Sequence, residues 1–221
     1  MLSRFFVPFF IVGCLALAVA GELYISKALL SDVKKMYGEQ AGRRVLSWQN
    51  IMLNNKGLSE RQKMEKVNRF FNQLEFISDI KHWGMEDFWA TPVEFLASGG
   101  GDCEDFSIAK YYTLRELGIP DSKLRITYVE ALELKQAHMV LSYYSRPNSE
   151  PLILDNLKGE ILPAGQRKDL KPVYNFNGDG LWVAKQRGKG VRVGKADRLN
   201  LWVDLRKRFK ASVEQGKAST R

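Results

Sequence analysis

Polar and apolar positions follow a helical period in the first half of the chain and a strand-like period in much of the second half. Residues 22–54 and 59–78 mix polar and apolar positions in a helical manner, and the second segment repeats apolar positions at a spacing near 3.6, which predicts two helices. A third helix is predicted over 103–117, because three glycines precede it and Gly118 follows it. We expect the first two helices to pack around the third.

The second half of the chain reads as strands joined by tight turns. Three apolar runs predict strands at 124–129, 138–144 and 151–156. The turn signal at 145–149 makes the last two antiparallel neighbours, and the sequence Asn-Gly-Asp-Gly at 177–180 predicts a further hairpin. Helices followed by hairpin-connected strands indicate an α+β fold.

The amino terminus has the pattern of an export signal. A short positive start at Met1–Arg4 is followed by 17 uncharged residues, and Ala18–Ala20 supplies small residues where a signal peptidase cuts. Residues 1–20 are therefore predicted to be a signal peptide directing export to the periplasm. The run is interrupted by Pro8 and is shorter than the roughly 20 apolar residues of a membrane span. An uncleaved anchor stays open as an alternative.

Composition and charge describe an ordinary folded domain with a basic end. The chain has 221 residues, 45% of them hydrophobic, and a formal net charge of +9, which excludes a disordered chain or a disulfide scaffold. Residues 185–221 carry 12 Lys and Arg against three acids, so the rest is close to neutral and offers no nucleic-acid-binding face. The predicted organisation is a domain over 21–190 followed by a basic, solvated tail over 191–221. Within that tail, residues 201–209 are a candidate for a short amphipathic helix that contacts the membrane surface or the domain.

Cys103 is the only cysteine left after the predicted signal, and its neighbours suggest chemistry. At the start of a helix, unpaired N–H groups and the helix dipole favour a thiolate. Glycines at 99–101 are expected to leave room for a substrate backbone. Asp102, Glu104 and Asp105 should oppose ionisation of the thiol unless another group offsets their charge. The alternative is a small cysteine buried for packing.

A histidine and an aspartate are predicted to meet at one edge of the sheet. His138 opens one predicted strand and Asp155 closes the next, and in an antiparallel pair these two ends are adjacent. Cys103, His138 and Asp155 thus form a workable nucleophile, base and orienting carboxylate. A structural histidine and a turn-forming aspartate are the alternatives. His82 has no comparable partner and is interpreted as structural.

The residues around Cys103 also resemble a known family. Gly-Gly-Gly-Asp-Cys-Glu-Asp-Phe at 99–106, Ala-His-Met-Val at 137–140 and Leu-Asp-Asn at 154–156 resemble the bacterial transglutaminase-like cysteine proteinases of the LapG type. The resemblance spans roughly 30–185. It implies a papain/transglutaminase-like α+β fold, with the nucleophile helix packed on an antiparallel sheet. It also implies Cys103 as nucleophile, His138 as general base and acid, and Asp155 as the residue that orients the imidazole.

Calcium is part of what this resemblance implies. LapG-type enzymes depend on Ca2+, and the positions flanking the nucleophile, Asp102 and Glu104, correspond to its ligands. Carboxylate oxygens suit this ion. Asp105 is a weaker candidate, equally suited to capping the helix or pairing with a lysine. Two carboxylates do not complete a calcium site, so further ligands are expected that the sequence does not identify.

The resemblance implies a substrate and a regulator as well. Such proteases cleave a large surface adhesin at a paired-alanine site near its amino terminus and release the cell from a biofilm. An inner-membrane receptor that senses cyclic di-GMP captures the protease through its periplasmic part. Two other functions stay open: a transglutaminase-like acyltransferase that passes the thioester to an amine, and a non-catalytic module that binds a metal such as zinc.

Overall fold

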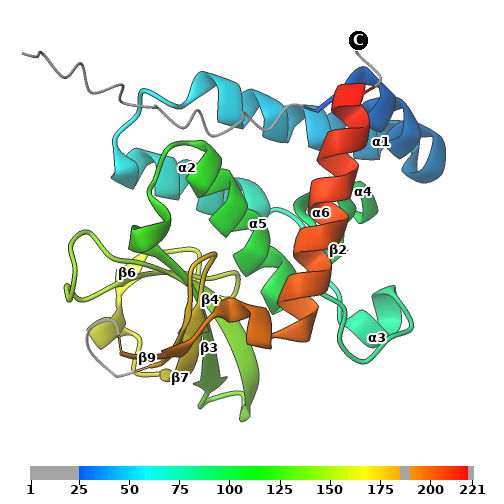
Figure 1. Ribbon diagram of the computed structural model, residues 1–221. Helices are drawn as coiled ribbons and strands as arrows, with labels where there is room; N and C mark the ends of the chain where they lie inside the picture. The colour runs from blue at the N-terminus through cyan, green and yellow to red at the C-terminus, as the bar shows by residue number, and fades with distance from the viewer. Residues whose placement is uncertain (1–24, 185–189, 219–221) are drawn as a thin grey trace, which may run out of the picture.

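The computed structural model describes residues 25–184 and 190–218, which fold into a helical layer packed on a sheet (Figure 1). The helices are α1 (Lys27–Asn54), α2 (Glu60–Phe71), α3 (Asp79–His82), α4 (Pro92–Ser98), α5 (Cys103–Glu116) and α6 (Asn200–Ala218). None of the helices in these described ranges is long and apolar enough to cross a bilayer. The predicted signal peptide, 1–20, lies outside the described residues.

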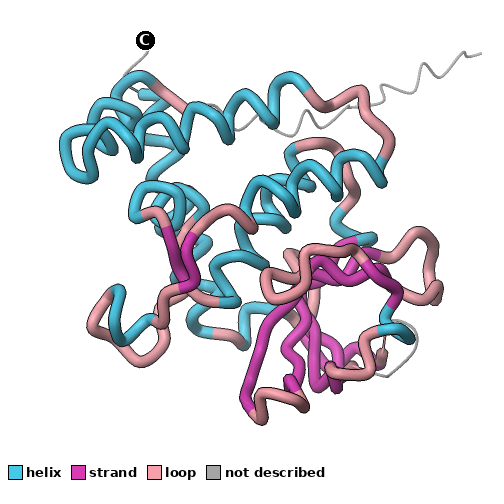
Figure 2. Tube along the Cα trace, turned by 180° about the vertical axis from the view of Figure 1, so that it is seen from behind, coloured by secondary structure: helices cyan, strands magenta, loops and turns pink. Residues whose placement is uncertain are grey.

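A seven-stranded antiparallel sheet forms the second layer. Its strands are β3 (Leu124–Ala131), β4 (Gln136–Tyr143), β5 (Leu152–Leu154), β6 (Leu162–Pro163), β7 (Leu170–Phe176), β8 (Leu181–Val183) and β9 (Val191–Gly194). The spatial order is β6-β5-β4-β3-β7-β8-β9, and every neighbouring pair is antiparallel. Both predicted hairpins are therefore confirmed. A separate parallel pair, β1 (Glu75–Phe76) and β2 (Gly100–Gly101), lies among the helices (Figure 2).

Helix α5 lies against β3 and β4 and joins the two layers. The Ser107 hydroxyl donates to the Met139 carbonyl of β4 at 3.0 Å. On its other side, Thr113 accepts a hydrogen bond from the Trp48 indole of α1 at 2.7 Å. The α+β fold with a central helix on an antiparallel sheet is confirmed.

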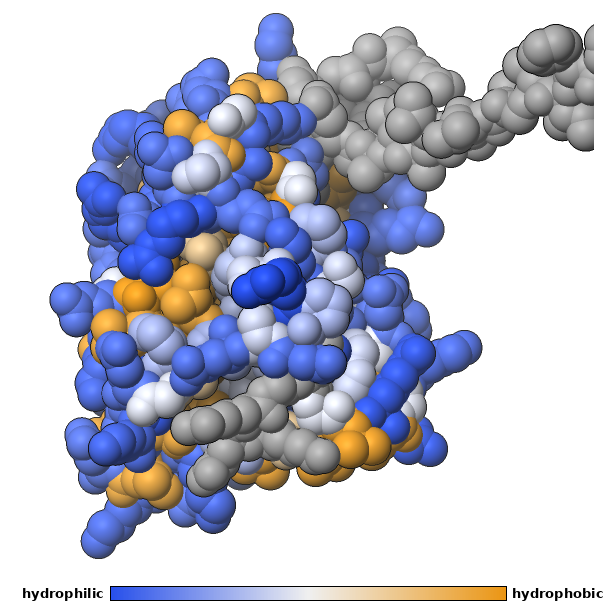
Figure 3. All heavy atoms as spheres, turned by 90° about the vertical axis from the view of Figure 1, so that its left-hand side faces the viewer, coloured by the Kyte–Doolittle hydropathy of each residue, from blue (hydrophilic) through white to orange (hydrophobic). Residues whose placement is uncertain are grey.

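The core fills the space between the layers. Trp48, Phe95, Tyr111 and Phe176 are fully enclosed there, and burying a side chain of this size stabilises a fold by about 1.5–3 kcal/mol. By contrast, hydrophilic residues cover most of the face seen in Figure 3, and apolar residues gather there in smaller patches. Large apolar residues are thus mostly buried and polar residues mostly exposed, as the pattern of the sequence predicts.

The predicted helix at 59–78 is shorter in the structure. A capping box starts α2: the Ser59 side chain accepts from the Gln62 backbone, and the Gln62 side chain accepts from the Ser59 backbone. The helix ends at Phe71, and residues 75–76 form β1 instead. The backbone of residues 75–76 forms its hydrogen bonds with β2 and not within a helix. This tertiary contact overrides the helix that the apolar spacing predicts there.

The carboxyl-terminal segment, expected to be a solvated tail, is part of the same fold where the structure describes it. Residues 191–194 form β9 at the edge of the sheet. Helix α6 buries Trp202, Leu205 and Phe209 against the helical layer. Its basic residues Arg206, Lys207 and Lys210 are exposed, whereas Arg208 is partly buried and pairs with Glu94. The charge is thus the solvent face of an amphipathic helix.

Candidate active site

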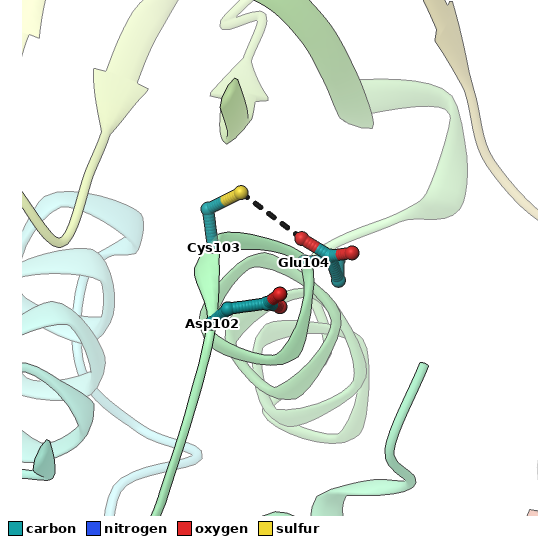
Figure 4. A group of neighbouring side chains, drawn as sticks. All are labelled: Asp102, Cys103 and Glu104. Carbon is teal, nitrogen blue, oxygen red and sulfur yellow. Dashed lines mark hydrogen bonds between the residues drawn. The ribbon is translucent and has the colours of Figure 1, made fainter. Parts of the chain in front are cut away.

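The turn before α5 fixes the position of Cys103. Helix α4 ends at Ser98, and Gly99, which caps it, adopts the left-handed conformation with φ of 89° and allows the chain to reverse into β2. Asp102 then occupies the position before the first turn of α5. Cys103 is half-buried at that start, and its sulfur lies 3.0 Å from Glu104 Oε2 (Figure 4).

The glycines at 99–101 have a structural role that differs from the expected one. Gly100 and Gly101 are buried. A Cβ on Gly100 would lie 2.6 Å from the Glu75 carbonyl oxygen, and a Cβ on Gly101 would lie 2.1 Å from Asp105 Oδ2. These residues are small because β1 and α5 approach the backbone closely. They leave space for the protein itself and not for a substrate backbone.

A cavity of about 360 Å³ opens beside Cys103. His138 from β4 lines it together with Cys103. The parallel rings of Tyr128 and Tyr174, with centroids 4.9 Å apart, form part of its wall. Because the cavity lies where the helical layer meets the sheet, it joins groups that are far apart in the sequence.

Asp155 holds the ring of His138. The His138 Nε2 atom lies 2.8 Å from Asp155 Oδ1, and both side chains are almost completely buried. Engaging Nε2 fixes the ring orientation and leaves Nδ1 as the nitrogen for exchanging a proton with a thiol. The structure thus brings the three predicted residues together. Cys103 and His138 line the cavity, and Asp155 lies behind the imidazole.

Arg167 is a further buried partner of Asp155 that sequence reasoning missed. Its guanidinium donates to Asp155 Oδ2 at 2.6 Å, and the Leu157 N–H donates to Oδ1 at 3.0 Å. Burial raises the pKa of Asp155, but the hydrogen bond and charge of His138, together with the hydrogen bonds from Leu157 and Arg167, outweigh it and lower that pKa to about 2. The carboxylate is therefore ionised at neutral pH.

Acidic side chains crowd the other side of Cys103. Ligand oxygens of Asp79, Asp87 and Glu104 lie within 4.8 Å of one another, as do those of Asp79, Asp102 and Asp105. Burial, then Glu104 and the other acids, raises the pKa of Asp102 to about 10, and burial raises that of Asp79 to about 6. Such a cluster is costly unless protons or a cation offset the charge.

The same acids act on the thiol. Burial raises the pKa of Cys103, and the charges of Glu104 and Asp102 raise it further. A backbone hydrogen bond from Met139 acts in the opposite direction and lowers the thiol pKa. Burial and the acids together outweigh the effect of the helix start on the thiol pKa, so the predicted preference for a thiolate needs an additional positive group.

Comparison with known proteins identifies the family. Residues 43–169, more than half of the chain, match bacterial transglutaminase-like cysteine proteinase BTLCP. This chain belongs to that family. Legionella pneumophila LapG is similar in structure, with a TM-score of 0.74 and 44% identity over 85% of this chain and 99% of that one. LapG from the same organism in calcium-bound form has a TM-score of 0.71 and 46% identity over 83% and 99%. No curated protein matches.

The proteinase is thus a LapG-like cysteine protease with a transglutaminase-like fold.

Besides Arg167, a second cation acts on the buried carboxylate of Asp155. Lys110 on α5 is completely buried, and its ammonium lies 5.7 Å from the centre of the Phe106 ring. Burial lowers the pKa of Lys110 to about 7, and the charge of Asp155 opposes this shift. His82, interpreted as structural, lies on α3 with its ring against Trp83.

Replacing Arg167 by glutamine is expected to destabilise the proteinase strongly. The change leaves Asp155 and Asp169 without their guanidinium partner, and breaking a buried ion pair costs about 3–5 kcal/mol. An aspartate whose pKa is lowered by folding stabilises the folded state at pH values above its pKa in the unfolded state. This stabilisation is lost as the pH falls through its pKa in the folded state. Losing Arg167 raises the folded pKa of Asp155, so acid unfolding should begin at a higher pH. Denaturant unfolding between pH 3 and 8 measures both effects.

Lys171→Gln is the matched control. Lys171 pairs with Glu130 at 3.0 Å, but both side chains are about half exposed. Solvent screening limits such a pair to less than about 1 kcal/mol. Equal losses of stability in the two variants would contradict a special role for Arg167.

Proposed function

We propose that the protein is a calcium-dependent periplasmic cysteine endopeptidase that cleaves the amino-terminal region of a large surface adhesin at a paired-alanine site. The observation that carries this proposal is the arrangement of Cys103 and His138 on one cavity, with the imidazole held by Asp155. Membership of the cysteine proteinase family and similarity to Legionella LapG support the substrate class. Cleavage of such an adhesin would release the cell from a biofilm.

The proposed reaction is acyl transfer from the peptide to water. His138 Nδ1 takes the thiol proton of Cys103, and the sulfur attacks the carbonyl carbon of the scissile peptide. Nδ1 then returns the proton to the leaving amine, which departs as the C–N bond breaks. A water molecule, deprotonated by His138, hydrolyses the thioester and restores the thiol. The backbone N–H of Cys103 at the start of α5 is suited to stabilising the oxyanion.

Asp155 and Arg167 are proposed to position the base. Asp155 accepts from Nε2 and stabilises the imidazolium formed when the thiol proton moves to Nδ1. Arg167 keeps the carboxylate ionised and fixes its direction. Because both groups are buried, the imidazole has one preferred orientation toward the cavity.

The residues beside Cys103 fit a calcium ion. Buried oxygens of Asp79, Asp102 and Asp105 have no hydrogen-bond partner in the described chain, and oxygen-rich clusters of this kind suit Ca2+. We propose Asp102 and Glu104 as ligands, with Asp79 and Asp87 as the further ligands that the sequence did not identify. When bound, the ion would offset the negative charge around the sulfur. The calcium-bound form of Legionella LapG supports calcium as the ion.

Control of the protease is proposed to come from an inner-membrane receptor that responds to cyclic di-GMP. Its periplasmic part would capture the enzyme and withhold it from the adhesin. The similarity to LapG supports a protein substrate, and the predicted export signal is consistent with the periplasm.

Incubation with an amino-terminal adhesin fragment tests the proposal. We expect a single cut in the presence of calcium, no cut in EGTA, and resistance of a fragment whose paired alanines are replaced by bulky residues. Mass spectrometry of the products distinguishes hydrolysis, which leaves a free carboxylate, from transfer to an added amine. A product linked to the amine in place of the carboxylate would favour the acyltransferase function, and an intact fragment with calcium would contradict the proposal.

A further inference from the structure

Strand β1 is paired along one edge only. The N–H of Glu75 donates to the Gly99 carbonyl at 3.3 Å. The N–H of Ile77 donates to the Gly101 carbonyl at 2.9 Å. Because backbone groups alternate in direction along a strand, the N–H and C=O of Phe76 point away from β2. Among the described residues this small sheet has two strands, so the edge at Phe76 carries no third strand.

This edge lies at the cavity of the active site. Phe76 and Ser78 line the cavity together with Cys103 and His138. The Phe76 side chain is 53% exposed, and Leu157, which also lines the cavity, is 48% exposed. An open strand edge and two exposed apolar side chains thus lie beside the half-buried sulfur.

The neighbouring backbone does not offer a comparable edge. Gly100 and Gly101 of β2 are buried, and their α-carbons are closely covered by Glu75 and Asp105. Open edges that accept a further strand are normally shielded in folded proteins. At β1 the edge is short and is left open next to the cavity.

We propose that an extended segment of the protein substrate adds to β1 as an antiparallel strand, with one substrate residue exchanging both backbone hydrogen bonds with Phe76. This inference rests on the proposed endopeptidase function and specifies how the enzyme holds the substrate backbone. A residue that exchanges both bonds with its partner is the hydrogen-bonded pair of an antiparallel ladder. In strand addition, these backbone hydrogen bonds provide affinity, and pockets beside the strand select the side chains of the bound segment. Phe76 and Leu157 supply the apolar contacts.

Phe76→Pro tests the bond donated by the enzyme. Proline removes the N–H that points to the substrate, and the N–H groups of Glu75 and Ile77 that hold β2 remain. Extended backbone at Glu75 is compatible with a following proline. Phe76→Ala keeps the N–H and removes only the side chain, so it measures the apolar contact separately. We expect kcat/KM for the adhesin fragment to be roughly tenfold lower in Phe76→Pro than in Phe76→Ala, the size of one lost hydrogen bond.

Two readouts separate this effect from damage to the fold or the nucleophile. Thermal unfolding and the rate of Cys103 alkylation by iodoacetamide should be the same in Phe76→Pro and Phe76→Ala. In the wild-type enzyme, synthetic peptides with single amide-to-ester replacements around the scissile bond test the bond accepted by the Phe76 carbonyl. Ester replacement at one position, on one side of the scissile bond, should lower kcat/KM about tenfold.

The outcomes distinguish the two levels of the proposal. If Phe76→Pro cleaves the fragment as fast as the wild type does, or if no ester replacement lowers kcat/KM, strand addition is overturned. The endopeptidase function would then still stand. If Phe76→Pro is misfolded, the ester scan on the wild-type enzyme decides alone. Failure of the wild-type enzyme to cut the fragment would remove the proposed function and this inference with it.

Discussion

Replacing Cys103 by alanine is expected to abolish cleavage of the adhesin fragment while preserving the fold. Removing the nucleophile of a protease that acts through a covalent intermediate lowers kcat by more than about 10³-fold. The sulfur is half-buried and its side-chain contact is to Glu104, and alanine favours a helix. Gel analysis of the fragment over hours, with circular dichroism of the variant, measures both expectations.

Thr113→Ala is the matched control on the same helix. Its hydroxyl bonds Trp48 and the Ala109 carbonyl, ten residues beyond the sulfur. Loss of these buried bonds should lower the free energy of unfolding by about 1–3 kcal/mol and leave cleavage measurable. Turnover by Cys103→Ala at the rate of Thr113→Ala would exclude Cys103 as the nucleophile.

Removing calcium is expected to have the second largest effect. EGTA should stop cleavage, and the double variant Asp102→Asn/Glu104→Gln should remain inactive when calcium is restored. Losing direct ligands should weaken calcium binding at least as much as the roughly 10- to 100-fold that losing an outer-shell partner costs. Calorimetry measures the affinity. The rise of Tm with calcium, present in the wild type because the ion binds the folded state, should be lost in the variant.

Glu130→Gln controls for the general effect of removing an acid. Glu130 is exposed and pairs with Lys171 outside the cluster, so both the calcium affinity and the rise of Tm should persist. A double variant that binds calcium as tightly as the wild type would show that Asp102 and Glu104 are not ligands. Full cleavage in EGTA would remove calcium from the reaction.

The sequence predicts Cys103, His138 and Asp155 because each stands at the end of a predicted element, although in the structure His138 is the third residue of β4. Helix period, turn residues and antiparallel order place such ends relative to one another. The strands at 124–129, 138–144 and 151–156 occur in the structure with bounds shifted by at most two residues. These features rest on local patterns, which a single sequence displays.

The partners of these residues depend on tertiary contacts that no local pattern reveals. Asp79 and Asp87 lie 16 to 24 positions before Cys103, in a stretch with no helical or strand period. Arg167 is chemically like the arginines on the surface, and only folding shows that it is buried behind Asp155. The expectation about 99–101 failed for the same reason, since the atoms that crowd these glycines belong to β1 and Asp105.

The packing of Gly100 and Gly101 bears on any effort to redirect the enzyme to other peptides. A side chain added at Gly100 would clash with the Glu75 carbonyl of β1, and one added at Gly101 would clash with Asp105 of α5, so these two positions are unsuited to substitution. Phe76 and Leu157, with half of their surface in solvent, are the positions where libraries of substitutions can reshape selectivity at little cost in stability.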